Sequence, residues 1–158
     1  PRPLPAEALL DAATPATAVP VSLPVAGLTA VPKAMRLPDA LEARHNPATL
    51  FVNQFGRGNR DDVMRTNDGA ISQALAMMND PTVTTRVRRA NNSTVAKVLA
   101  STSDPGAIAD QLYLATLSRK PTTAERQIAI DYLRAGVLAE RAEDLQFTLI
   151  NSLEFLFV

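Results

Sequence analysis

The chain has 158 residues, of which 46% are hydrophobic, and its 16 basic and 16 acidic side chains give a formal net charge of zero. Because it contains one His and no Cys, the sequence excludes disulfides, thiolate metal sites, cysteine nucleophiles and three-histidine metal sites, and we expect no cofactor. The even charge does not favour a nucleic-acid partner. No apolar stretch approaches the roughly 18 residues that span a bilayer, so no transmembrane segment is expected.

The first residues contain neither Met nor the apolar region of a signal peptide. We therefore expect residues 1–158 to be a single helical domain that forms part of a larger protein. At this length a chain can bury enough apolar surface to fold without disulfides or metal.

Proline marks the N-terminal third, because nine of the twelve prolines fall within residues 1–47. A short helix is predicted at about residues 5–14. Proline restricts its own backbone and that of the residue before it, so residues 14–45 are predicted to form an extended arm. Their Val and Leu content is too high for a solvated linker. We expect this arm to pack on the helical body, with room for one short β pairing.

Residues 46–158 are predicted to be the helical body. Pro is tolerated in the first turn of a helix, and a preceding Asn or Asp can cap the free N–H groups. Three such pairs are expected to open helices that end near Gly56, Arg89 and Arg119: Asn46-Pro47, Asp80-Pro81 and Asp104-Pro105. The spacing of apolar residues, and the residues that typically start and end helices, predict four further helices, over about residues 69–79, 93–101, 122–135 and from 138 onward.

The residues around Pro121 give the most detailed prediction of local structure, the end of one helix and the start of the next. Thr122 and Glu125 have the spacing of a capping box, and Arg119 with Lys120 suits the C-terminus of the preceding helix. The last residues are too apolar to be left in water, and Phe155 and Phe157 should hold them on the domain. The predicted fold class is all-α: a compact bundle of about six to eight helices with a proline-rich extended N-terminal arm packed on it.

One polar segment, residues 56–69, combines charge, glycine and amides on a predicted loop. It is the candidate ligand or partner loop, with these residues as its candidates: Arg57, Arg60, Asp61, Asp62, Asn67 and Asp68. Its oxygen ligands could hold calcium, but Met64 and Thr66 break the order of an EF-hand loop, and a solvated loop with Arg–Asp pairs is favoured. His45 stands alone and is assigned no role, and no residues are proposed as catalytic.

Five blocks of the sequence are familiar in content and order: residues 2–12, 55–57, 73–79, 112–125 and 151–157. The most specific are Leu-Tyr-x-x-x-Leu-Ser-Arg-x-Pro-Thr and Asn-Ser-x-Glu-Phe-Leu-Phe. Together they resemble the C-terminal part of the planctomycete-type PSD domain, a domain of unknown function in large exported bacterial proteins with cytochrome-c-like modules. The resemblance implies a periplasmic or otherwise extracytoplasmic location and a link to the breakdown of complex polysaccharides. It supplies no catalytic residues.

Two functions remain open from the sequence. The first is a non-catalytic scaffold or interaction domain that docks on other domains of the parent chain or on an exported partner protein. The alternative is part of a composite carbohydrate-binding or hydrolytic site, completed by upstream domains and edged by residues 57–68. A sugar platform normally uses exposed aromatic rings, and the chain has five Phe and two Tyr, most of them on predicted core stripes. This favours the first function.

Overall fold

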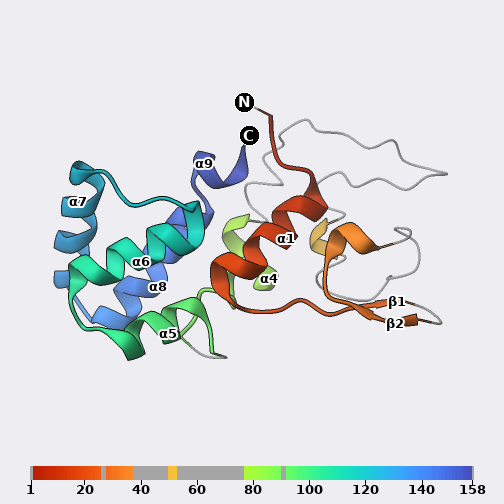
Figure 1. The fold of residues 1–158 in the computed structure, drawn as a ribbon, viewed down its shortest axis with the longest axis horizontal. Helices are drawn as coiled ribbons and strands as arrows, with labels where there is room; N and C mark the ends of the chain where they lie inside the picture. Colours follow the sequence, from red (N-terminus) through yellow and green to blue (C-terminus); the bar gives the residue numbers. More distant parts are fainter. Residues whose placement is uncertain (1, 26–27, 38–49, 53–76, 90–91, 158) are drawn as a thin grey trace.

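The computed structural model describes residues 2–25, 28–37, 50–52, 77–89 and 92–157. The chain is mostly helical, and one two-stranded sheet lies within the described part, which confirms the predicted all-α class. Figure 1 shows two halves side by side, with α1 and the strands in one half and α5 to α8 in the other.

The first half begins with α1 (Ala6–Thr17), which is followed by β1 (Leu23–Val25), β2 (Leu28–Val31) and the 3-10 helix η1 (Ala34–Arg36). The strands pair antiparallel, with Leu23 opposite Val31. Asp11 of α1 fixes the end of this hairpin, because its two carboxylate oxygens accept hydrogen bonds from the backbone N–H groups of Ala34 and Met35 at 2.6 and 3.1 Å.

The predicted end of the first helix near residue 14 is wrong. Helix α1 continues through Pro15 to Thr17 and ends at Ala18, which adopts the left-handed conformation with φ 56°. A proline near the C-terminus of a helix removes one backbone hydrogen bond. Burial of Ala16 and Thr17 outweighs that loss, and the Thr17 hydroxyl adds a hydrogen bond to the Ala13 carbonyl at 2.7 Å.

The helices that follow start at capping residues, with the exception of α8. Their bounds are α4 (Pro81–Thr84), α5 (Thr94–Ser101), α6 (Pro105–Leu117), α7 (Thr123–Arg134), α8 (Leu138–Ile150) and α9 (Leu153–Leu156). Asp80, Ser93, Asp104, Thr122 and Ser152 each accept a hydrogen bond from a backbone N–H of the first turn. The predicted starts near residues 81, 93, 105 and 122 are thus confirmed.

Helix α4 is shorter than predicted. The Asp80-Pro81 pair does open a helix, but the helix ends at Thr84 and not near Arg89. Most residues from Thr82 to Val87 are β-branched, and such side chains lose rotamer freedom in a helix. The chain instead turns after Thr84, where the Arg86 N–H donates to the Val83 carbonyl at 3.1 Å.

The described apolar side chains form two hydrophobic cores. The first core contains α1 side chains such as Leu10 together with Leu23, Phe51 and Val52. The second core joins α5, α6, α7 and α8 around Ile108 and similar side chains. Leu117, at the end of α6, packs against both cores.

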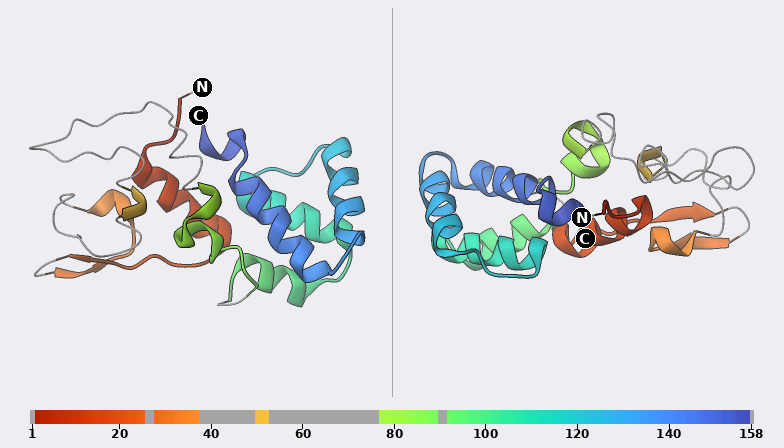
Figure 2. Two further views of the ribbon diagram at one scale, coloured as in Figure 1. Left: turned by 180° about the vertical axis from the view of Figure 1, so that it is seen from behind. Right: turned by 90° about the horizontal axis from the view of Figure 1, so that it is seen from above.

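The two ends of the described chain meet. The Leu4 N–H donates to the Leu156 carbonyl at 2.9 Å, and Pro3 forms an isolated antiparallel bridge with Phe157. Both marked termini lie together in Figures 1 and 2. Phe155 is buried in the first core, which confirms that the apolar tail packs on the domain.

Several predictions concern residues that the structure does not describe. They include arm residues 38–45 and most of the helices expected at 46–56 and 69–79, of which residues 50–52 and 77–79 are described and helical. Among the described helices, none combines the length and the apolar character that crossing a bilayer requires.

Candidate functional site

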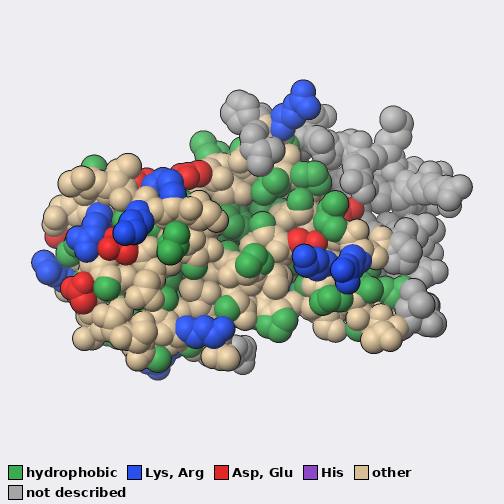
Figure 3. All heavy atoms as spheres, viewed as in Figure 1, with side chains coloured by type: hydrophobic (Ala, Val, Ile, Leu, Met, Phe, Trp, Pro, Cys, Tyr) green, Lys and Arg blue, Asp and Glu red, His purple; other side chains and the backbone are tan. Residues whose placement is uncertain are grey.

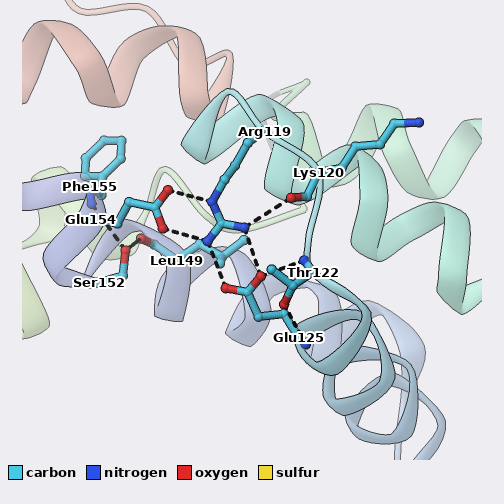
Figure 4. A network of polar contacts seen from close by, with 8 residues as sticks. All are labelled: Arg119, Lys120, Thr122, Glu125, Leu149, Ser152, Glu154 and Phe155. Carbon is cyan, nitrogen blue, oxygen red and sulfur yellow. Dashed lines mark hydrogen bonds and ion pairs between the residues drawn. The ribbon is translucent and has the colours of Figure 1, made fainter.

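The candidate loop lies outside the described residues, and so does His45. This applies to all six of its proposed residues: Arg57, Arg60, Asp61, Asp62, Asn67 and Asp68. Within the part of the chain that the structure does describe, no group of three or more Asp, Glu or His side chains could hold a metal ion. The best-defined polar cluster there surrounds Arg119, and we call Arg119, Thr122, Glu125 and Glu154 the Arg119 clamp (Figure 4).

Three helix ends bring the clamp together. Helix α6 ends at Ser118, whose left-handed backbone with φ 57° turns the chain out of the helix just before Arg119. Glu125 is the third residue of α7 and forms the predicted capping box with Thr122. Glu154 lies in the first turn of α9, which Ser152 caps. The residues that start and end these helices therefore position each charged side chain.

The guanidinium of Arg119 has all its hydrogens engaged. Its Nε and Nη2 donate to the two carboxylate oxygens of Glu154 at 2.6 and 2.7 Å. Its Nη2 and Nη1 donate to the two oxygens of Glu125 at 2.8 and 2.9 Å, and Nη1 also donates to the Lys120 carbonyl at 3.1 Å. An arginine carries five N–H donors, and these five contacts use them.

Glu125 serves two structures at once. Its Oε2 accepts from Arg119 and also from the Thr122 N–H at 2.7 Å, while the Thr122 hydroxyl accepts from the Glu125 N–H at 3.3 Å. Hydrogen bonds from Arg119, and then from Thr122, lower the pKa of Glu125 to about 2. Hydrogen bonds from Arg119 likewise lower the pKa of Glu154. Both carboxylates are therefore ionised and acceptor-only at neutral pH.

The surroundings of the clamp are half open to solvent. The side chains of Arg119, Glu125 and Glu154 are 34%, 33% and 47% exposed, so water screens their charges. The Arg119 guanidinium lies 5.6 Å from the centre of the Tyr113 ring. Burial, and then the charge of Glu125, raises the pKa of Tyr113, so this phenol stays neutral at ordinary pH. The arrangement connects α6, α7 and α9 and leaves the guanidinium no N–H for a bound anion.

A second polar cluster joins the two halves near the C-terminus of α1, and we call Arg86, Glu143 and Gln146 the polar seam. Gln146 is fully buried, and its Nε2 donates to the Ala16 carbonyl at 2.7 Å. The buried Arg86 donates to the Val19 carbonyl. The carbonyls of the last helical turn, such as that of Ala16, lack partners within the helix, and the Gln146 amide supplies one. The positive charge of Arg86 near the C-terminus of α1 also interacts favourably with the helix dipole.

Glu143 of α8 completes the seam by holding the turn after α4. Its carboxylate accepts from the Arg89 N–H at 2.7 Å and from the Arg88 guanidinium at 3.0 Å. Desolvation lowers the pKa of Arg86, which nevertheless stays protonated because the ordinary pKa of an arginine lies far above neutral pH. The seam thus connects α8 to the end of α1 through Gln146 and to the turn after α4 through Glu143.

Sequence reasoning found part of the clamp and missed the rest. It identified the Thr122–Glu125 capping box but gave Arg119 only the role of a helix C-terminal charge. The structure shows Arg119 beyond the end of α6 and paired with two carboxylates. No local spacing links Arg119 to Glu154, which lies 35 residues later. The presence of both residues in the most specific blocks was the available signal.

The described fold is that of a helical domain whose most organised polar residues join its own elements. A model of the PSD1 family, described as a protein of unknown function (DUF1553), matches residues 29–133. The chain belongs to this family. The match includes the block at residues 112–125, and therefore Arg119 and Glu125 of the clamp, while Glu154 lies beyond it. Comparison with curated proteins and with solved structures gives no match.

Proposed function

We propose that this chain is a non-catalytic scaffold or interaction domain of an exported bacterial protein, acting outside the cytoplasm. Its partner is another domain of the parent protein or a separate exported protein. The observation that carries the proposal is the saturated Arg119 clamp. Arg119 and Glu125, which lie within the family match, bind each other, and together with Glu154 they fix the relative positions of α6, α7 and α9.

The surface offers apolar groups for such contacts. Figure 3 shows hydrophobic side chains at the surface of both halves. Large apolar side chains that are more than half exposed include Met35, Leu50, Met78, Leu114, Ile128, Val137 and Leu153. Single exposed apolar side chains are common on soluble proteins. In a docking domain, the members of the contact face become buried when the partner binds, and these residues are where substitution should start.

Calorimetric titration of this chain with the separately produced remainder of its parent protein tests the proposal. We expect saturable binding that weakens when Leu114, Ile128 or Leu153, each of them more than half exposed, is replaced by Ser. Gln127→Ser, an exposed polar position on α7 next to Ile128, is the matched control and should leave binding unchanged. A folded chain that binds none of the parent protein but binds an oligosaccharide would refute docking and support the composite carbohydrate site.

A further inference from the structure

Helix α9 lies where the two hydrophobic cores meet. It follows α8, whose last residues divide between the cores, since Leu149 belongs to the second and Ile150 to the first. Phe155 of α9 is buried in the first core, whereas Glu154 reaches Arg119 at the end of α6 in the other half (Figure 4). One four-residue helix therefore contacts both halves of the molecule.

The contacts that hold α9 differ in their exposure to water. Phe155 is 7% exposed and supplies the buried anchor. The Glu154 side chain is 47% exposed, and an ion pair this accessible weakens as salt screens it. A single helical turn has little stability of its own. Among the contacts that hold α9, Phe155 is thus the most deeply buried and the Arg119–Glu154 pair is the one that salt screens.

The same helix holds the N-terminal segment. The Leu4 N–H donates to the Leu156 carbonyl, and Pro3 pairs with Phe157. Leu4 and Leu156 are both partly buried against the first core. If α9 moves away, residues 3–4 lose their backbone partner, and the apolar surface beneath Leu4, Phe155 and Leu156 meets water.

We propose that α9 and residues 3–4 form a terminal latch, which opens and closes over the first core while the rest of the fold stays intact. The Arg119–Glu154 pair sets the balance between the two states and makes it sensitive to ionic strength. The halves stay joined in the open state through the polar seam, where Gln146 and Arg86 donate to carbonyls at the end of α1. This latch does not depend on the proposed docking function.

Amide hydrogen exchange of the whole chain, resolved by residue, tests the latch. The reporters are the N–H groups of Leu4 and Phe157, which donate to Leu156 and Leu153. Raising sodium chloride from 20 to 500 mM should speed their exchange about two- to fivefold, the range that a screened surface pair allows. Glu154→Gln should give the same increase at low salt and remove the salt effect. The Leu112 N–H, inside α6, should stay far better protected than these two reporters under every condition.

Asp110→Asn is the matched control, because it removes an ion pair of similar exposure, the 2.9 Å contact between Asp110 and Arg126. It should leave exchange of the Leu4 N–H unchanged. Phe155→Ala should open the latch almost completely while α8 stays protected. The proposal is overturned if salt and Glu154→Gln leave the Leu4 N–H unchanged, or if the N–H groups of α6 and α8 in the Phe155→Ala protein are no better protected than that of Leu4.

Discussion

Phe155 makes the contribution of the C-terminal helix to stability measurable. Its side chain is 7% exposed and lies in the first core. A buried Phe removes about 200 Å² of apolar surface from water, and at about 25 cal/mol per Å² this amounts to about 5 kcal/mol. Alanine retains part of that burial, and the denatured chain already hides some of the surface, so Phe155→Ala should cost about 3 kcal/mol.

Urea unfolding followed by circular dichroism measures this loss. With an m value of about 2 kcal/mol per M, the midpoint should fall by about 1.5 M. Leu153→Ala, on the same helix but 74% exposed, is the matched control and should move the midpoint little. Removing residues 153–158 should lower the midpoint at least as much as Phe155→Ala. Midpoints for the truncated and Phe155→Ala proteins equal to that of the wild type would show that α9 does not stabilise the domain.

Three further perturbations test the local structures. Thr122→Ala should cost about 1 kcal/mol in urea unfolding through loss of the capping box, whereas Thr123→Ala should not; equal effects would contradict the capping role. Gly106→Ala places a methyl group against the Arg126 guanidinium. Alanine stabilises a helix by up to about 1 kcal/mol relative to glycine, and this gain should appear in full only when Arg126 is also replaced by Ala. If the effects of the two substitutions simply add in that double-mutant cycle, the clash is contradicted. The pKa of Glu125 is lowered to about 2 from an ordinary value near 4.5, so the stability it adds is present above about pH 4.5 and is lost as pH falls toward 2. The gap in urea midpoint between wild type and Glu125→Gln should therefore be widest at pH 6 and narrow by pH 2.5, and a gap independent of pH would contradict the ion pair.

Helix starts were predictable because their chemistry is local. Asp104 and Thr122 each cap the backbone two or three residues ahead, so sequence spacing alone contains the information. Helix ends were less predictable, because they depend on what the last turn packs against. Pro15 argues for an end that burial of Ala16 and Thr17 overrides, and the β-branched residues after Thr84 end α4 despite its cap.

The polar contacts between the halves could not be read from spacing. Gln146 follows the apolar face of α8, and nothing nearby in the sequence shows that it donates to Ala16, 130 residues away. Nothing near Arg86 in the sequence shows that it is buried and donates to the Val19 carbonyl, 67 residues away. Tertiary packing brings the partners of each of these hydrogen bonds together, so the local sequence could not predict them.

Arg119 connects two sequence blocks, residues 112–125 and 151–157, that lie far apart in the chain. The first block contributes Arg119 and Glu125, and the second contributes Glu154 beside the buried Phe155. One guanidinium serves two carboxylates, so each acid is stabilised by the same cation, and the two acids repel each other if that cation is lost. Arg119 is therefore the residue on which both blocks depend. Because Arg119 also pairs with Glu154 of α9, we expect a substitution of Arg119 to weaken the hydrogen bond between Leu4 and Leu156, which joins the two ends of the described chain.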